Sequence, residues 1–488
     1  MKRFVVCFAV SALLGPIEAG AQEPVDLQAI ERIKAEGLQR SQVLDIFGAL
    51  TDVFGPRLTA TPAYKAAANW AAKSLEAWGM ENVHLESWEF GRGWTLDHFT
   101  LEMVEPRYFP MIGYPEAWTP PTRGEIVTAP VFIGDKTADE IRAMASELRG
   151  AVVLPVPTQD AFITEDRQQP TEFEERVRIG APRTIRTAGP VGRRDLPALL
   201  QEVGAAVQLR PSQGAHGTMF VLGRRQTTDD AVPTVVVAGE HYNMLVRMVQ
   251  RGVDVKLRVN VQATYHEDDT NGYNVIAEIP GTDPDLRDEV VMLGAHLDSW
   301  HSAPGATDNA DGVATTMEAM RILKAINVAP RRTIRLALWG GEEQGLLGSR
   351  EYVQRHLAGD ENRTQRDKLS VYFNHDPGTG PIYGFYLEEN SAAKPILDAW
   401  LEPLRDLGAR RNVIDKIGST DHLSFIRAGI PGFNTVQDYT DYDVRTHHTN
   451  MDTFERLSEA DLMESAILLA TFVYHAAMRD EKIPRGPR

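Results

Sequence analysis

The stretch Glu289-Val290-Val291-Met292-Leu293-Gly294-Ala295-His296-Leu297-Asp298-Ser299 joins a short apolar run to polar side chains. We interpret residues 289–295 as a strand. In a continuing strand, residues i and i+2 point the same way, so His296 and Asp298 can face one site. His296 could then bind a metal while Asp298 orients a ligand or a reacting group. A His-x-Asp pair at a strand end also arises by chance, so the pair alone is weak evidence.

Further apolar runs alternate with helical patterns on both sides of this strand. Expected strands are residues 83–90, 273–279, 289–295, 333–339, 369–375 and 432–436. Expected helices are residues 27–50, 62–79, 312–326 and 345–356, and a last helix begins near Ser458. This alternation predicts an α/β fold with a mostly parallel, doubly wound sheet and helices on both faces. Ligands of such sheets gather beyond the carboxyl ends of the strands.

Carboxylates follow two more of these runs. Asp308 lies in a Gly/Asn-rich turn before the helix at Gly312, where both oxygens could bridge two cations. The alternative is a helix cap, for which Asp311 is the better candidate. Glu342 and Glu343 end the next strand, and adjacent carboxylates repel unless a cation or a proton lies between them. One is readily a ligand and the other a general base, although a lone Glu-Glu pair is more often a solvated loop.

Asp376 and a pair of histidines complete the candidate set. Asp376 follows the strand 369–375, where a turn-forming role before proline explains it equally well. His447 and His448 lie after the strand 432–436, only one of them is needed as a ligand, and Asp452 could accept its hydrogen bond. Five metal-competent groups after consecutive strands are rarely a coincidence. Two histidines and three carboxylates would hold two cations, which lie ~3.5–4 Å apart in such sites with a water between them.

The middle of the chain has a different character. Short β-rich runs at residues 129–133, 151–155, 206–209 and 234–238 are separated by Gly and Pro, and residues 165–194 are charged without periodicity. We interpret the region as an inserted, mainly β domain with a long surface loop. A chain of 488 residues is also long enough for two cores.

The N-terminus resembles a secretory signal. Met1-Lys2-Arg3 precedes an apolar run over residues 4–14 and the small residues Ala19-Gly20-Ala21, so we expect cleavage after Ala21 and a secreted or periplasmic protein. The run is shorter than the ~20 residues of a membrane span. The single cysteine, Cys7, lies inside this segment. Metal ligands must therefore be histidines and carboxylates, which suit zinc. The net charge of −17 argues against nucleic-acid binding.

The ordered motifs resemble a known family. They are His296-Leu297-Asp298-Ser299, the Asp308 turn, Glu342-Glu343, Asp376 and His448-Thr449-x-x-Asp452-Thr453, with further likeness in residues 54–59 and 420–425. Together they are similar to the co-catalytic di-zinc exopeptidases, family twenty-eight of the metallopeptidases. Within that family the chain most resembles the carboxypeptidase Q branch, which inserts a protease-associated domain where the β-rich region lies.

The resemblance implies a role for each residue. His296 and Glu343 would bind separate zinc ions, Asp308 would bridge the two ions, and Asp376 and His448 would complete their ligands. His448 is preferred to His447 because the family pattern is His-Thr-x-x-Asp. Glu342 would be the general acid and base, and Asp298 would orient His296. The resemblance also implies a signal over residues 1–21, a peptidase domain over 22–118 and 264–488, and a protease-associated domain over 119–263.

The same resemblance implies hydrolysis of dipeptides or short peptides that have a free α-amine, and it suggests a homodimer. One alternative is a glutaminyl cyclase-like protein with a single zinc, and another is a noncatalytic binding protein of the same fold. The complete ligand set favours hydrolysis. Three features stay open: residues 438–445, including Arg445, could line a specificity pocket or form a surface loop, and His301 and His422 have no assigned role.

Overall fold

The computed structural model of the protein describes residues 23–169, 189–192, 194–225, 227–376 and 378–486. The expected signal segment, with Cys7, lies outside these residues, as does most of the charged stretch 165–194. Among the described residues, no helix combines the length and the apolar character needed to cross a membrane.

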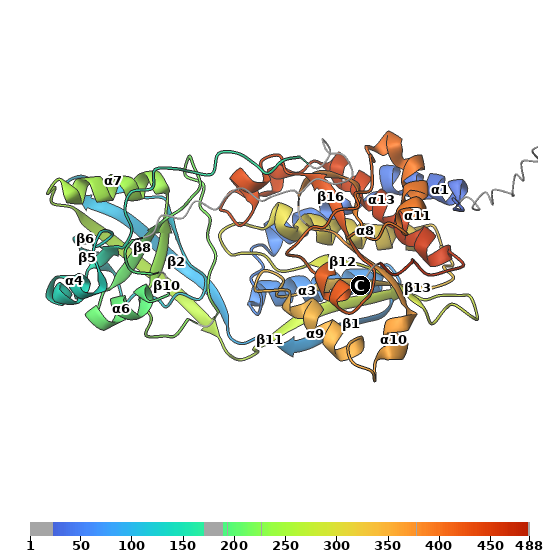
Figure 1. Ribbon diagram of the computed structural model, residues 1–488, viewed down its shortest axis with the longest axis horizontal. Helices are drawn as coiled ribbons and strands as arrows, with labels where there is room; N and C mark the ends of the chain where they lie inside the picture. The colour runs from blue at the N-terminus through green and yellow to red at the C-terminus, as the bar shows by residue number, and fades with distance from the viewer. Residues whose placement is uncertain (1–22, 170–188, 193, 226, 377, 487–488) are drawn as a thin grey trace, which may run out of the picture.

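A seven-stranded sheet forms the centre of the larger lobe (Figure 1). Its order is β1 (Glu81–Glu89), β11 (Asn271–Ile279), β13 (Thr333–Trp339), β12 (Val290–His296), β14 (Leu369–Asn374), β16 (Gly432–Asp438) and β15 (Thr379–Tyr386). The middle strands β13, β12, β14 and β16 are parallel. The strands at both edges are antiparallel. The expected parallel arrangement therefore holds for the strands that carry the site.

Helices cover both faces of this sheet, as the alternating pattern predicted. Along β12, Leu293 packs into one apolar cluster and the preceding Met292 into another on the opposite face. The first cluster includes α1 (Leu27–Gln39), α2 (Val43–Gly48), α3 (Pro62–Ala77), α8 (Asp311–Ala325), α11 (Lys394–Leu401) and α13 (Glu459–Met478). The second includes α9 (Leu347–His356) and α12 (His422–Arg427), and α10 (Arg363–Lys368) precedes β14.

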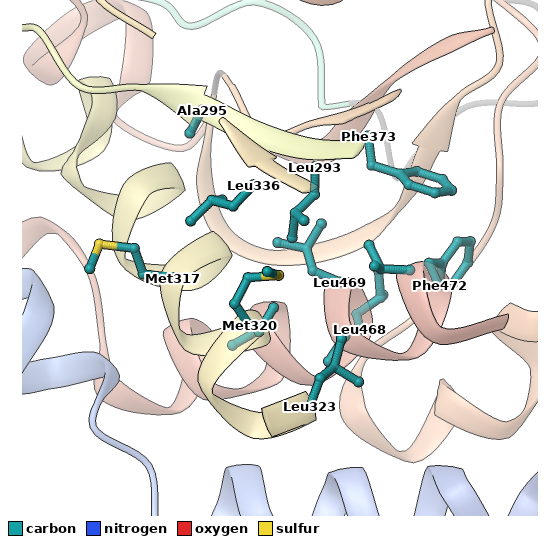
Figure 2. Packing of buried hydrophobic residues seen from close by; sticks show 14 of the residues in the cluster. Leu293, Ala295, Met317, Met320, Leu323, Leu336, Phe373, Leu468, Leu469 and Phe472 are labelled. Atoms are coloured by element: carbon teal, nitrogen blue, oxygen red, sulfur yellow. The ribbon is translucent and has the colours of Figure 1, made fainter. Parts of the chain in front are cut away.

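Helices α8 and α13 fill the space beneath the middle strands (Figure 2). Their side chains meet those of the sheet in a cluster that includes Leu293, Ala295, Met317, Met320, Leu323, Leu336, Phe373, Leu468, Leu469 and Phe472. These residues are at most 3% exposed, so α8, which follows the turn at Asp308, is fixed against β12, which precedes that turn. Such packing gives the site a rigid base.

Capping residues set several helix boundaries. Helix α3 begins at Pro62, and the Thr61 side chain accepts a hydrogen bond from the Tyr64 amide. Helix α13 begins after Ser458, whose hydroxyl accepts from the Asp461 amide, as its sequence suggested. The helical pattern over 27–50 is divided: α1 ends at Gln39 and α2 begins at Val43, whose amide donates to the Ser41 hydroxyl. Short helical turns η1 (Ala49–Val53), η3 (Ala306–Ala310), η4 (Glu402–Leu407), η5 (Tyr442–Thr446) and η6 (Phe454–Arg456) lie between the longer elements.

A second lobe, which we call the inserted lobe, runs from β2 to β10 and lies beside the larger one (Figure 1). One of its sheets has the order β3 (Phe109–Pro110), β2 (Gly93–Glu105), β10 (Lys256–His266) and β5 (Ile126–Thr128). The other has the order β4 (Gly113–Pro115), β9 (Thr234–Val237), β8 (Val207–Pro211), β7 (Val152–Leu154) and β6 (Pro130–Phe132). The strands expected from the β-rich runs are all present.

The inserted lobe also contains helices that the sequence analysis did not identify. They are α4 (Ala138–Ala143), α5 (Ala145–Leu148), α6 (Leu196–Val203) and α7 (Gly239–Gln250). Three of the four are eight residues or shorter, which gives periodicity little room to appear. The domain bounds 119–263 fall within this lobe and stay a prediction.

Candidate metal centre

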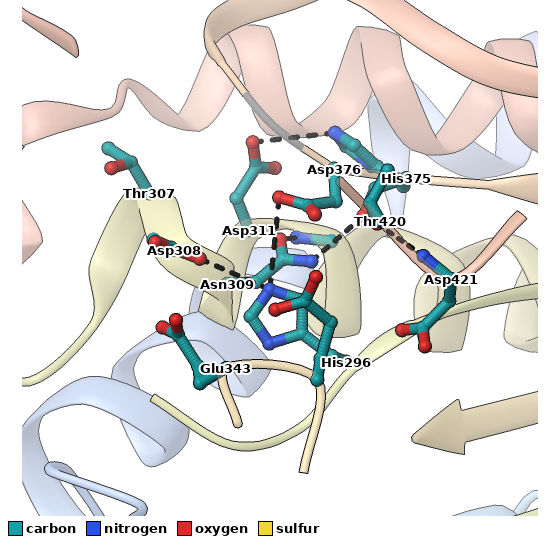
Figure 3. Close-up of polar contacts among 12 residues, drawn as sticks. His296, Thr307, Asp308, Asn309, Asp311, Glu343, His375, Asp376, Thr420 and Asp421 are labelled. Atoms are coloured by element: carbon teal, nitrogen blue, oxygen red, sulfur yellow. Dashed lines mark hydrogen bonds and ion pairs between the residues drawn. The ribbon is translucent and has the colours of Figure 1, made fainter. Parts of the chain in front are cut away.

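Three of the expected ligands meet at the carboxyl end of the parallel strands. His296 ends β12, Asp308 lies in the turn before α8, and Asp376 follows β14. The His296 Nε2 atom is 3.1 Å from Asp308 Oδ1 and 3.8 Å from Asp376 Oδ1. Figure 3 shows Asp308, Asp376 and Glu343 around the His296 ring. The topology of the sheet therefore brings together residues that are far apart in the sequence.

The remaining two expected ligands lie on the other side of Asp308. The His448 Nε2 atom is 3.3 Å from Asp308 Oδ2 and 3.0 Å from Glu343 Oε2. The two oxygens of Asp308 thus face different histidines. All five residues proposed as ligands form one continuous group, with Asp308 at its centre.

The chemistry of this group fits metal cations. His296 Nε2 and Glu343 Oε1 are among the buried side-chain atoms of the described residues that have no hydrogen-bond partner, a situation that proteins generally avoid. Asp308 and Asp376 are 6% and 5% exposed, so their negative charges are poorly screened. Imidazole and carboxylate donors are the usual protein ligands of zinc when cysteine is absent.

The electrostatics also favour positive charge at this point. Burial and, after it, the negative charge of Asp308 together raise the pKa of Glu343 to about 7. Although burial favours a neutral imidazole, Glu343 and Asp308 raise the pKa of His448 to about 9. Burial also opposes ionisation of Asp308, yet its contacts with His296 and His448 hold its pKa below the usual range. The group therefore attracts protons or cations.

Glu342 is adjacent to the ligand group but contacts none of its histidines through an ion pair in the described structure. Burial raises the pKa of its carboxyl well above the usual range; Asp376 and Asp421 act in the same direction and His296 opposes them. Its side chain is 9% exposed. These properties suit a carboxylate that exchanges protons rather than one that holds a metal.

Residues 274–473 of the chain match the family described as Peptidase family M28. Over 461 residues the chain is 28% identical to carboxypeptidase Q of Mus musculus, covering 94% of this chain and 90% of that protein. The part of the chain that carries the candidate metal centre therefore matches peptidase family M28. The family resemblance and the assignment to the metallopeptidases are therefore confirmed.

Solved structures share the fold of this chain. The M28 peptidase precursor of Shewanella amazonensis superposes with a TM-score of 0.69 at 24% identity, covering 94% of this chain and 99% of that one. A zinc aminopeptidase of Bacillus subtilis, BSAP, gives a TM-score of 0.58 at 20% identity, covering 90% of this chain and 95% of that one. The expected fold class is thus confirmed.

Asp298 contacts more of the candidate site than the sequence predicted. The His296 Nδ1 atom is 2.9 Å from the Asp298 backbone oxygen and 3.7 Å from its carboxylate. The carboxylate instead accepts hydrogen bonds from the backbone amides of Glu342 and Glu343, at 3.1 and 3.3 Å. Asp298 therefore fixes the position of the neighbouring strand end as well as the His296 ring.

Asp452 has partners other than the one suggested for it. One of its oxygens accepts from the amide and the hydroxyl of Thr307, and the other accepts from the Asp308 amide at 3.1 Å. The idea that Asp452 supports a histidine ligand was therefore wrong. Its carboxylate is occupied by backbone donors of the turn and so positions Asp308 instead.

Arg57 has a structural role that the sequence does not reveal. Its side chain is fully buried and donates hydrogen bonds to the carbonyls of Leu50, Leu297, Pro304 and Gly305. These bonds tie together the loops that surround Asp298 and Asp308. Its motif, residues 54–59, was recognised, but the motif alone does not indicate backbone partners.

The open residues also have structural partners. His301 Nε2 lies 2.8 Å from the Pro115 carbonyl and its ring contacts Trp94. His422 Nε2 lies 3.3 Å from a Glu388 oxygen. Neither belongs to the described groups of metal-competent ligand atoms, whereas His447 does, together with Asp308 and His448.

A cavity of about 930 Å³ lies between the two lobes of this peptidase and reaches His447 and His448. The inserted lobe contributes Arg194, Arg210 and Arg224 to its lining. Arg210 forms an ion pair with Glu116. The cavity therefore connects the candidate metal centre to positive charge on the inserted lobe.

Proposed function

We propose that the protein is a zinc-dependent exopeptidase that holds two zinc ions and hydrolyses dipeptides or short peptides. The observation that carries this proposal is the position of Asp308, whose two oxygens face separate histidines. His296, Asp308 and Asp376 would hold one ion, and Asp308, Glu343 and His448 would hold the other. Zinc ions bound there would polarise a peptide carbonyl and make water more acidic.

Glu342 would move the protons of the reaction. As a buried carboxylate outside the ligand group, it is suited to accept a proton from the attacking water and to donate it to the leaving amine. The hydrogen bond from the Glu342 amide to the Asp298 carboxylate would keep the base at a fixed distance from His296. This arrangement supports hydrolysis rather than binding alone.

The charges around the cavity support substrates with two free ends. The buried carboxylates of the metal centre attract a free α-ammonium group, which favours an exopeptidase. On the inserted lobe, the guanidinium groups of Arg194 and Arg224 form no ion pair with any described residue and could bind the substrate carboxylate. Arg445 is less suitable for this role, because it donates to the Thr218 hydroxyl and does not line the cavity.

Secretion and dimer formation are part of the proposal, although they rest on other evidence. The signal-like residues 1–21 support export, with cleavage after Ala21. The proposed homodimer rests on the resemblance to the carboxypeptidase Q branch. Peptide substrates are the expected partners, and the negative net charge disfavours nucleic acid.

The proposal is tested with a panel of dipeptides and aminoacyl anilides, using metal-depleted and zinc-restored protein. We expect hydrolysis to disappear on depletion and to return as two equivalents of zinc are bound. Cyclisation of N-terminal glutamine with one equivalent would favour the glutaminyl cyclase alternative. Zinc binding without turnover of any substrate in the panel would favour a noncatalytic protein.

A further inference from the structure

The loop that carries His448 is enclosed by two segments of the inserted lobe. We call residues 438–450 the ligand loop. One segment, residues 166–169, we call the strap, and the other comprises residues 218–221. Both segments are remote from the ligand loop in the sequence, and neither contributes an expected metal ligand.

A buried ion pair fastens the strap to the ligand loop. The Arg167 guanidinium binds Asp443 in a two-pronged contact, with distances of 2.6 Å from Nη2 and 2.8 Å from Nε. The two side chains are only 10% and 5% exposed, so water weakens the pair little. The adjacent Asp166 accepts hydrogen bonds from the amides of Asp441 and Val444. The strap therefore holds both the side chains and the backbone of the loop.

A series of contacts between side chains runs from this ion pair to His448, the expected ligand. The Arg167 guanidinium carbon lies 5.4 Å from the centre of the Tyr442 ring. Tyr442 stacks on His447 with the ring centres 4.9 Å apart and the planes 17° apart. The ring centres of His447 and His448 are 3.8 Å apart, and the ring planes are tilted by 37°. A displacement of the strap would thus reach His448 through direct contacts.

The second segment holds the backbone of the ligand itself. The Val221 amide donates to the His448 carbonyl at 3.1 Å. The Met219 amide donates to the Asn450 side chain at 2.8 Å, and the Asn450 amide donates back to the Met219 carbonyl at 3.2 Å. His448 has a φ of 61°, which residues other than glycine seldom adopt. Such a conformation persists only where the surroundings hold it.

We infer that the inserted lobe positions His448 for metal binding, and that Arg167 is the main positioning residue. Arg167 contacts neither the other expected ligands nor Glu342; it acts through Asp443, Tyr442 and His447. The inference rests on the proposed function, because it requires His448 to be a ligand. The inserted lobe would then do more than line the cavity, because it would hold His448 in place as a ligand of one of the two proposed metal sites.

The test compares the Arg167→Met variant with Arg142→Met. Arg142 is a matched control, since it also lies in the inserted lobe and forms ion pairs, but only with Asp139 and Glu202 of that lobe. Zinc-loaded protein is mixed with a chromophoric chelator, and the release of each equivalent is followed. We expect Arg167→Met to release one equivalent at least tenfold faster than the wild type, while the other equivalent and the control are unchanged.

Two further variants separate positioning from general damage. Arg167→Lys keeps the charge but loses the two-pronged geometry, so its release rate should be intermediate. Asp443→Asn removes the other partner, and the double variant with Arg167→Met should release zinc no faster than the worse single variant. If Arg167→Met does not fold, Asp443→Asn carries the test by the same criterion, and Arg167→Lys should release zinc at a rate between that of Asp443→Asn and that of the wild type.

Several outcomes would overturn the inference. One is release from Arg167→Met within twofold of the wild type. Another is equal acceleration of both equivalents together with a lower Tm, since that would indicate general destabilisation. A wild-type protein that binds no zinc would instead refute the proposed function, so the two failures can be told apart.

Discussion

Replacing Glu342 by glutamine should abolish proton transfer and leave the rest of the site intact. The glutamine side chain has nearly the same shape as that of glutamate. The hydrogen bond to the Asp298 carboxylate comes from the backbone amide of residue 342, so the substitution leaves it in place. General acid–base catalysis contributes about 10²–10⁴-fold to a rate, so kcat should fall by this factor, or ~2.7–5.5 kcal/mol in the activation barrier. The assay is hydrolysis of one dipeptide at saturating substrate, with bound zinc counted on the same sample.

The stability of this variant provides an internal control. Burial and the negative charges of Asp376 and Asp421 disfavour an ionised Glu342, so its neutral replacement should keep or slightly raise the Tm. Glu343→Gln is the matched comparison, because it changes the neighbouring carboxylate and should lower zinc content. Near-normal turnover of Glu342→Gln, or loss of zinc from it, would show that Glu342 is not the base.

Asp308→Ala should lower zinc content and Tm together, since both proposed ions share this ligand; retention of two zinc equivalents would contradict the bridge. Hydrogen bonds from Lys65, Tyr273 and Asn271 outweigh burial and hold the pKa of Asp269 at about 2. Because the pKa of Asp269 is lower in the folded protein than its unfolded value of 3.8, the ionised carboxylate stabilises the fold at pH values above 3.8. This stabilisation is lost as the pH falls towards 2. Because the Asp269 side chain is 36% exposed, we expect Asp269→Asn to lower the free energy of unfolding by only about 1 kcal/mol at pH 7. Urea unfolding should show a smaller loss at pH 2, and equal losses at both pH values would refute this prediction. N-acetylation of a dipeptide should abolish its cleavage, and C-amidation should lower kcat/KM roughly tenfold to a hundredfold, the worth of a charged hydrogen bond of ~1.5–3 kcal/mol. Arg224→Met should remove the difference between acid and amide, and an unchanged difference would exclude this residue.

The grouping of the candidate ligands could be predicted, because short local sequence patterns identify the strands and turns that carry them. His296 ends the buried strand β12 and Glu343 lies shortly after the buried strand β13, and parallel strands bring their carboxyl ends to one edge. The supporting contacts could not be predicted in this way. Arg167 lies in a charged stretch without periodicity, and its partner Asp443 is 276 residues away in the sequence. Asp452 was recognised from its motif, but its hydrogen bond from the Thr307 amide depends on tertiary packing, which the motif does not show.

The register of the central strands explains why base and ligand stay together. Strands β12 and β13 are parallel, and His296 lies opposite Trp339, so the residues after both strands emerge at the same edge. The Asp298 carboxylate then accepts the amides of Glu342 and Glu343, which joins the two strand ends through backbone hydrogen bonds. The separation between His296 and the proposed base is consequently set by the sheet rather than by flexible side chains.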